Sequence, residues 1–193
     1  MRRRWFLLGF LAGALLSFIV YYSAEHATHA QAKTQALTPA IIAPAPPAVS
    51  SQIASPIAGL KRSELRDSFN ETHFGHKHEA IDIMEPRGTP VLAVTDGAIA
   101  KLMRSKAGGN SIYQFDTASR YCYYYAHLDH YAEGIADGVE VTRGEVIGYV
   151  GSTGNASPNA PHLHFGISLV GPDHKWSGGT PIDPYPLLLA AAK

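Results

Sequence analysis

From Leu60 to the C-terminus, short β-branched and aromatic runs alternate with Gly, Pro, Asn and Asp. No long stretch of this part repeats its apolar residues with a helical period. Strands bounded by turn residues fit this pattern, whereas long helices do not. Six strands are expected, at residues 91–95, 98–103, 111–116, 121–126, 146–150 and 163–169. Asp96-Gly97 predicts a hairpin between the first two, and only residues 61–67 and 185–192 suggest short helices.

Residues 61–193 are therefore expected to form a mostly β domain with few short helices. Its architecture would be a compact antiparallel β-sandwich or a partly open barrel. A segment of this length is long enough to bury a hydrophobic core.

The first residues of the chain predict a membrane segment. Three arginines at positions 2–4 precede an uncharged run from Trp5 to Tyr22, with aromatic residues at both ends. A helix over this run would span roughly 27 Å, close to the thickness of a bilayer core. Residues 1–23 are expected to be one transmembrane signal anchor in the cytoplasmic (inner) membrane, with the rest of the chain exported. The alternative is a signal peptide cleaved near Ala30, which would leave the domain periplasmic or secreted.

Residues 24–60 have the composition of a linker. They are rich in Ala, Thr, Gln and Ser and contain five prolines. Such a segment buries too little apolar surface to order itself, and proline stiffens it into an extended spacer. A disordered linker between the membrane helix and the domain implies a target at some distance from the membrane.

Charge and cysteine content exclude several classes of function. Sixteen basic residues balance sixteen acidic ones, so no global field favours nucleic acid, and none is expected as a partner. A single cysteine, Cys122, excludes an intrachain disulfide framework and a Cys-rich zinc finger. It lies in a Tyr-rich strand, where a buried small hydrophobe is expected rather than a reactive thiol. Ten histidines remain as the main source of chemistry.

Two short motifs have the residue types of a metal site. His-Leu-His at 162–164 lies on an expected strand, where both imidazoles point to the same face. His-Glu-Ala-Ile-Asp at 78–82 offers one imidazole and one carboxylate. In a straight strand His78 and Asp82 would lie roughly 13 Å apart, too far to share an ion. A shared ion therefore requires the chain to bend between them.

His127 ends the Tyr-rich strand, where a histidine alone is commonly structural. Taken together, however, these motifs suggest a catalytic zinc centre. His78, Asp82 and one of the pair His162 and His164 would supply three ligands and leave a fourth position for water. The remaining histidines would steer that water and stabilise a developing oxyanion.

The motifs are part of a longer ordered pattern over roughly residues 69–185. It comprises His-x-x-x-Asp at 78–82, Gly-Thr-Pro-Val at 88–91, Asp-Gly at 96–97, Tyr-Ala-His-Leu at 125–128, Gly-x-x-Ile-Gly-x-Val-Gly-x-Thr-Gly at 144–154 and His-Leu-His-Phe at 162–165. This pattern resembles the lysostaphin/LytM-type zinc metallopeptidases of peptidoglycan, whose motifs follow the same order. Each piece alone is unspecific, but the ordered set is very specific.

The resemblance implies a duplicated hybrid motif fold and a Zn²⁺ site. Its zinc ligands would be His78, Asp82 and His164. The non-ligand catalytic histidines would be His127 and His162, polarising the attacking water and the scissile carbonyl.

Loops wall the substrate groove in such domains, and this makes Asn110 and Trp176 expected substrate contacts. The sequence alone would treat both as turn residues. Two positions depart from the family pattern: Ala80 stands where many members have Gly, and Gly166 where many have Glu. Neither change removes a ligand.

The expected function is a zinc-dependent endopeptidase that hydrolyses peptide cross-links or stem peptides of peptidoglycan in cell-wall remodelling. Its expected partners are peptidoglycan, the membrane through the N-terminal helix, and a cell-wall enzyme or regulator. Some relatives lose the ligands and activate cell-wall amidases. The alternative is therefore a non-catalytic activator or peptidoglycan-binding module, which would be indifferent to chelation. A carrier domain of the lipoyl type is disfavoured by the expected export and by the lack of an Asp-Lys pair at a hairpin tip.

Overall fold

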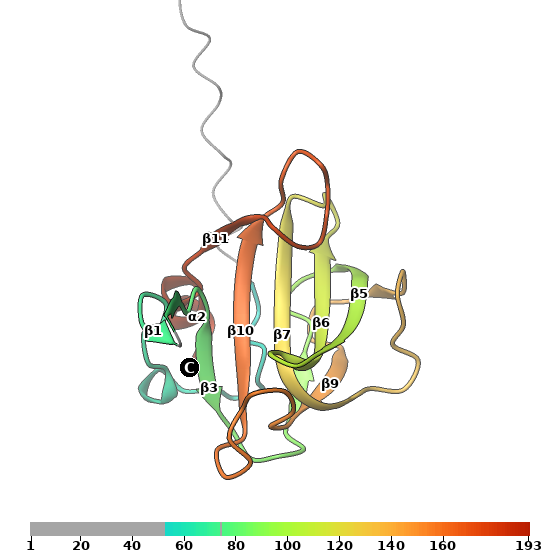
Figure 1. Ribbon diagram of the computed structural model, residues 1–193. Coiled ribbons are helices and arrows are strands. Elements are labelled where there is room, and N and C mark those ends of the chain that lie inside the picture. The colour runs from blue at the N-terminus through green and yellow to red at the C-terminus, as the bar shows by residue number, and fades with distance from the viewer. Residues whose placement is uncertain (1–52, 74) are drawn as a thin grey trace, which may run out of the picture. The chain divides into compact units, whose positions relative to one another are not determined.

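The computed structural model describes residues 53–73 and 75–193. Most regular elements of this part are strands (Figure 1). In chain order the elements are η1 (Arg62–Glu64), β1 (Thr72–His73), β2 (His76–Lys77), β3 (Ile81–Met84), β4 (Pro90–Leu92), β5 (Gly97–Ser105), β6 (Gly109–Asp116), β7 (Tyr121–Tyr131), β8 (Glu140–Val141), β9 (Val146–Val150), β10 (His162–Leu169), β11 (Thr180–Ile182) and α2 (Tyr185–Ala191). The pairings between these strands are antiparallel, so the prediction of a mostly β antiparallel domain is confirmed.

Nine strands form one hydrogen-bonded sheet, and β1 and β2 pair separately. The main path runs β11-β10-β7-β6-β5-β8, with β3 beside β10 and β9 beside both β7 and β4. In Figure 1, β10, β7 and β6 lie side by side at its centre. The ends of this path do not pair with each other, so the described sheet is not a closed barrel.

Two central strands each divide one edge between two partners. On β10, residues 162–165 pair with β3 and residues 167–169 pair with β11. On β7, residues 121–126 pair with β10 and residues 128–131 pair with β9. Residue 127 therefore stands where β7 passes from one partner to the other.

The expected elements differ from the observed ones mainly at short segments. The strand at 146–150 is confirmed, and four other expected strands lie within β5, β6, β7 and β10. The strand expected at 91–95 is replaced by the shorter β4, and residues 61–67 contain only the 3₁₀ turn η1. The strands β1, β2, β3, β8 and β11 were not predicted, because each has too few residues for an alternation of apolar and polar side chains to be recognised in the sequence.

Alternation along the strands separates the core from the opposite face of the sheet. On β10, Leu163, Phe165 and Ile167 are buried. Because successive strand residues point to opposite faces, His162 and His164 share the other one. On β3, buried residues flank Asp82 in the same way. Burial of these apolar side chains thus sets the direction of the polar ones.

Residues 53–60, which were expected to belong to the linker, pack against the core. Ile53, Ile57 and Leu60 are buried there. The amide of Lys193 donates to the Leu60 carbonyl (3.1 Å), and the amide of Arg62 donates to the Lys193 carbonyl (3.2 Å). The core therefore includes chain that lies before the expected boundary at residue 61.

The expected transmembrane segment at residues 1–23 and the linker up to residue 52 lie outside the described residues. The α-helix α2 has seven residues. No helix within residues 53–73 and 75–193 has the length and apolar content needed to cross a bilayer.

Candidate active site

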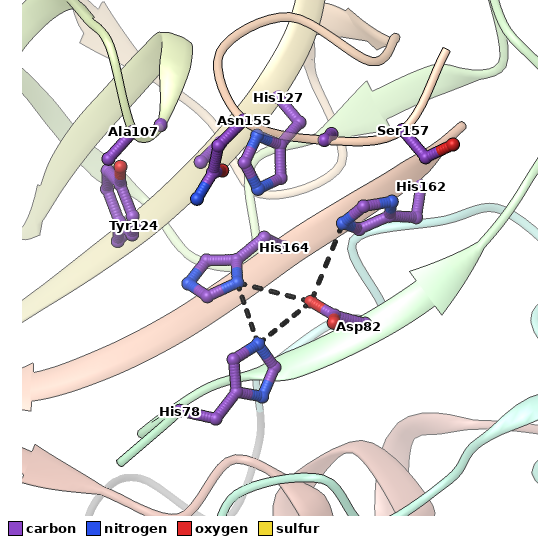
Figure 2. A pocket seen from close by; sticks show the side chains of 12 residues that line it. His78, Asp82, Ala107, Tyr124, His127, Asn155, Ser157, His162 and His164 are labelled. Atoms are coloured by element: carbon purple, nitrogen blue, oxygen red, sulfur yellow. Dashed lines mark hydrogen bonds and ion pairs between the residues drawn. The ribbon is translucent and has the colours of Figure 1, made fainter. Parts of the chain in front are cut away.

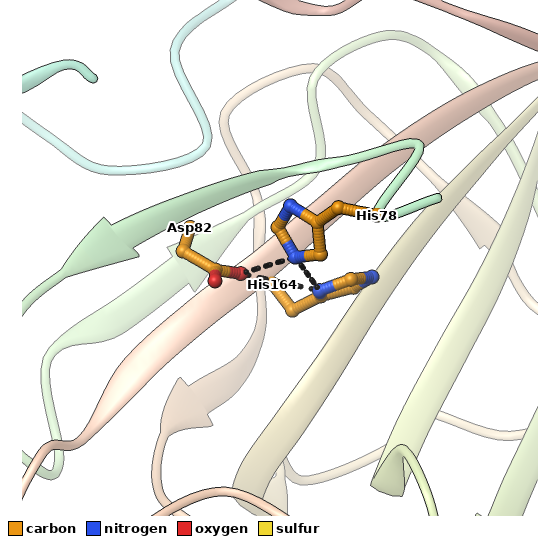
Figure 3. Close-up of side chains that lie close together, drawn as sticks. All are labelled: His78, Asp82 and His164. Carbon is orange, nitrogen blue, oxygen red and sulfur yellow. Dashed lines mark hydrogen bonds and ion pairs between the residues drawn. The ribbon is translucent and has the colours of Figure 1, made fainter. Parts of the chain in front are cut away.

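Three of the expected site residues meet beside the β3–β10 pair (Figure 3). Asp82 and His164 are direct partners across this pair, and His78 reaches them from the segment before β3. The nitrogen and oxygen atoms that the three residues offer lie within 4.8 Å of one another. His78 Nε2 and His164 Nδ1 each lie 3.1 Å from Asp82 Oδ1, and 3.0 Å from each other.

The chain bends between His78 and Asp82, as a shared site requires. Glu79 has a φ of 55°, in the left-handed region. The amides of His78 and Glu79 donate to the carbonyls of Glu71 and Phe69, at 2.8 and 3.0 Å. These bonds hold the bend that brings the His78 ring back over β3.

The hydrogen bond at Nδ1 of His78 determines whether Nε2 has a free lone pair. His78 Nδ1 lies 3.1 Å from the Ser68 carbonyl oxygen. A carbonyl oxygen only accepts, so Nδ1 carries the proton and the neutral ring presents the Nε2 lone pair to the cluster. Metal-binding histidines are commonly oriented by such a bond. Two imidazole nitrogens and one carboxylate oxygen are also the ligand types that zinc takes, so these residues fit Zn²⁺.

The three groups shift one another's protonation. The hydrogen bond to Asp82 raises the pKa of His78. Burial opposes ionisation of Asp82, but hydrogen bonds from His164 and His78 outweigh it and hold the pKa of this carboxyl well below its usual range. Burial lowers the pKa of His164 against the pull of Asp82. An ionised carboxylate and a neutral His164 suit a cation.

His162 and His127 flank this cluster without belonging to it (Figure 2). His162 Nε2 lies 3.8 Å from Asp82 Oδ1, and the ring centroids of His162 and His127 lie 4.9 Å apart. The Nδ1 atoms lie 2.9 Å from backbone carbonyls, of Ala160 for His162 and of Thr153 for His127. Nε2 is therefore the acceptor of both neutral rings, and both can take a proton from water in the pocket. Burial lowers the pKa of His127 to about 4, so this ring is neutral at pH 7.

The direction of His127 follows from a β-bulge. Its φ is 60°, and the register between β6 and β7 shifts between Asn110 and Ile112. As a result, the consecutive residues Ala126 and His127 line the same pocket, although neighbours in a regular strand face opposite sides. Bulges next to active sites re-aim side chains in this way.

Asp82 and the four histidines described above line a pocket of about 350 Å³. Its other lining residues are Ala107, Gly108, Tyr124, Ala126, Asn155, Ala156 and Ser157. A second pocket, of about 230 Å³, adjoins the first, and His78, Tyr124 and His164 line both. The two pockets together give a peptide room on both sides of the cluster.

Trp176 lies in the wall of the second pocket. Its ring centroid is 4.5 Å from that of Tyr113, which stacks on Tyr124 at the same distance. Tyr124 in turn meets the His164 ring edge to face at 5.8 Å. A row of rings therefore leads from Trp176 to the cluster, and this placement allows the expected contact with substrate.

Asn110 lines neither pocket. Its side-chain amide donates to the carbonyls of Leu128 and Asp129, at 3.2 and 2.9 Å. The expectation that Asn110 contacts substrate has no support in this geometry.

Sequence reasoning missed several lining residues. Alternation along β7 could have found Tyr124, because Tyr123 and Tyr125 are buried and Tyr124 must face the other side. Asn155 and Ser157 lie on the loop before β10, where no periodicity indicates direction.

Comparison with known proteins gives a consistent result. Residues 76–184 match the model of peptidase family M23. The L-Ala–D-Glu endopeptidase of Bacillus subtilis (strain 168) is 37% identical over 118 residues, covering 58% of this chain and 35% of that protein. Lysostaphin of Staphylococcus simulans is 35% identical over 118 residues, covering 61% of this chain and 22% of that protein. The chain thus spans about a third or less of these curated relatives.

Solved structures agree with the sequence matches. The catalytic domain of lysostaphin from Staphylococcus simulans is similar with a TM-score of 0.52 and 30% identity. The similarity covers 71% of this chain and 88% of that one.

Proposed function

Because this chain belongs to peptidase family M23, we propose that it is a zinc-dependent endopeptidase that hydrolyses peptide cross-links or stem peptides of peptidoglycan. One observation carries the proposal. His78, Asp82 and His164 converge on one point, and two further histidines present acceptor nitrogens to the same pocket. This is the arrangement that metal-assisted hydrolysis of a peptide requires.

The five residues would have different roles in hydrolysis. His78, Asp82 and His164 hold the ion. Bound zinc lowers the pKa of a coordinated water to about 7 and polarises the peptide carbonyl. Either His127 or His162 would accept one proton at Nε2 from the attacking water. Once protonated, that ring would donate a hydrogen bond to the oxygen on which negative charge develops, and it would then pass the proton to the leaving amine nitrogen.

The adjoining pockets support an extended peptide as substrate. A peptide that crosses the cluster would place neighbouring side chains against Tyr124 on one side and against the loop around Asn155 on the other. Relatives of similar identity are named for different bonds, an L-Ala–D-Glu endopeptidase and a glycyl-glycine endopeptidase among them. The bond cleaved here is therefore to be identified from the products.

We also propose that the domain acts outside the cytoplasmic membrane, anchored by residues 1–23. The apolar run behind three arginines supports this topology. Protease added to intact spheroplasts should degrade the domain, whereas a cytoplasmic control protein should survive. Protection of the domain until the membrane is lysed would refute the topology.

The function is tested with the purified full-length chain and isolated peptidoglycan sacculi. Released muropeptides are identified by mass spectrometry in the presence of a chelator and after zinc is restored. We expect zinc-dependent release of shortened or uncross-linked muropeptides, and no release by Asp82→Asn. The zinc-loaded, folded protein could instead release no muropeptides and stimulate a cell-wall amidase. That result would refute the proposed hydrolysis and assign the protein the function of a non-catalytic activator.

A further inference from the structure

The backbone of His127 needs support that strand pairing does not provide. Its φ of 60° lies in the left-handed region, where a residue other than glycine is strained. In the described sheet, β7 pairs through Ala126 and Leu128 on either side, and none of its registers includes His127. Groups outside the ladder must therefore hold the His127 bulge, which we define as residues 126–128.

Thr153 contacts this bulge at two points. Its carbonyl oxygen accepts the Nδ1 proton of the His127 ring (2.9 Å). Its hydroxyl donates to the carbonyl of Leu128, the residue that follows His127 (2.8 Å). One residue thus fixes both the tautomer of the ring and the backbone that carries it.

Asn110 completes the support from the neighbouring strand. Its backbone amide donates to Thr153 Oγ1 (2.9 Å), and its side-chain amide donates to the carbonyls of Leu128 and Asp129. The Thr153 hydroxyl therefore uses both its proton and a lone pair. The amide of His127 itself donates to the carbonyl of Gly108 (2.8 Å), at the tip of the β5–β6 hairpin.

From this geometry we infer that Thr153 and Asn110 are positioning residues, which hold His127 where its Nε2 meets the reacting water. The inference rests on the proposed function. Neither residue lines the catalytic pocket, so each acts through His127 and not on the substrate. A displacement of about 1 Å of a catalytic group can cost on the order of a hundredfold in rate.

A matched pair of substitutions at Thr153 tests the inference. Thr153→Val keeps the shape but removes the hydroxyl, whereas Thr153→Ser keeps the hydroxyl. We expect Thr153→Val to lower kcat by roughly 30-fold to 100-fold, with KM and bound zinc unchanged. Thr153→Ser should restore most of the rate. Thr142→Val, on an exposed loop where the hydroxyl meets Glu145, is the control and should behave as wild type.

A double-mutant cycle distinguishes positioning from general damage to the fold. In a His127→Ala background, Thr153→Val should cause little further loss, because the ring that it positions is already missing. A full additional loss in the double variant would overturn the inference, as would an unchanged kcat in Thr153→Val. If Thr153→Val does not fold, Asn110→Asp replaces it in the cycle, since its carboxylate would face the carbonyls of Leu128 and Asp129.

A spectroscopic measurement separates this inference from the proposed function. Long-range ¹H–¹⁵N spectra of the zinc-loaded protein should show the neutral His127 ring with its proton on Nδ1 alone in wild type. In Thr153→Val both tautomers should appear. If wild type releases no muropeptides, the proposed function fails whatever these spectra show. If wild type is active and the variant keeps both its rate and its single tautomer, only the inference fails.

Discussion

The imidazoles of His78 and His164 meet edge to face, with 4.7 Å between ring centroids, although 86 residues separate them in the chain. Their nitrogens, Nε2 and Nδ1, lie 3.0 Å apart and flank the same oxygen of Asp82. Two segments that are far apart in the sequence, the one before β3 and β10 itself, must therefore come together before the site can form. Binding of an ion at this point would therefore be coupled to folding.

Substitution of a ligand should remove zinc, whereas substitution of a flanking histidine should not. We expect His78→Ala and Asp82→Ala to lower zinc affinity by at least about a hundredfold and to abolish peptidoglycan hydrolysis. His127→Ala should keep stoichiometric zinc and lose most of its kcat. Isothermal titration with zinc and the muropeptide assay measure the two effects. His174→Ala, an exposed histidine outside the pockets, is the control. Full activity in His78→Ala would contradict the ligand assignment.

The buried His127 should make the metal-free protein less stable in acid. Its pKa is about 4 in the folded chain, against an ordinary value of 6.5. Between these values the unfolded chain binds a proton that the folded chain does not, so the free energy of unfolding falls as the pH falls from about 6.5 to 4. The expected loss is about 3 kcal/mol.

Urea denaturation of wild type and His127→Gln at pH 7, 5.5 and 4 measures this loss. The raised pKa of His78 acts with the opposite sign, stabilising the fold in acid, but it is common to both proteins and cancels in their difference. The stability advantage of wild type over the variant should shrink as the solution is acidified. An advantage that stays constant with pH would show that His127 is not held neutral by burial.

Two glycines with similar backbone conformations should differ in their tolerance of alanine. Gly154 and Gly134 have φ values of 76° and 82°. A Cβ on Gly134 meets nothing within 4 Å, whereas a Cβ on Gly154 would overlap the Ala107 carbonyl and the Gly109 amide. Gly134→Ala should cost about 1 kcal/mol of stability, and Gly154→Ala about 2–4 kcal/mol because of the overlap. Chemical denaturation of the two variants checks the difference, and equal losses would mean that these loops do not interlock.

Gly166 should control access to the second pocket. It follows His164 on the same face of β10, and a Cβ there would have only ordinary contacts, with nearest atoms at 3.7–3.8 Å. Gly166→Ala should therefore leave the kinetics nearly unchanged. Gly166→Glu should direct a longer, charged side chain into the pocket and raise KM about tenfold, or about 1.4 kcal/mol. Steady-state kinetics with zinc quantified in each variant test this, and an unchanged KM in Gly166→Glu would place the substrate elsewhere.

Strand alternation explains how much of the site the sequence could predict. It correctly placed His162 and His164 on one face, but a spacing of two residues cannot say which of them is a ligand. Pairing with β3 makes that distinction, because His164 lies opposite Asp82 and His162 lies opposite Met84. This register depends on a strand too short to be predicted, and only the resemblance to known peptidases had selected His164.

The surroundings of His127 were less predictable. Local sequence shows no sign of the bulge, because it arises from a register shift between strands. The same register shift places the side-chain amide of Asn110 beside two carbonyls of β7, to which it donates hydrogen bonds. The sequence could not show this contact. Likewise, residues 53–60 follow directly on the proline-rich linker and were assigned to it, but three of their apolar side chains reach the core.

The hydrogen bonds that join Leu60 to Lys193 and Lys193 to Arg62 hold residue 193 beside residues 60–62, near the start of this folded region. A unit whose two ends lie close together can be inserted into a loop of another protein with little distortion of either partner. It can also be circularly permuted: a Gly/Ser connection long enough to reach from residue 193 to residue 53 would leave the residues of the candidate metal site at their present positions. Such a geometry makes the region transferable between proteins as a cassette.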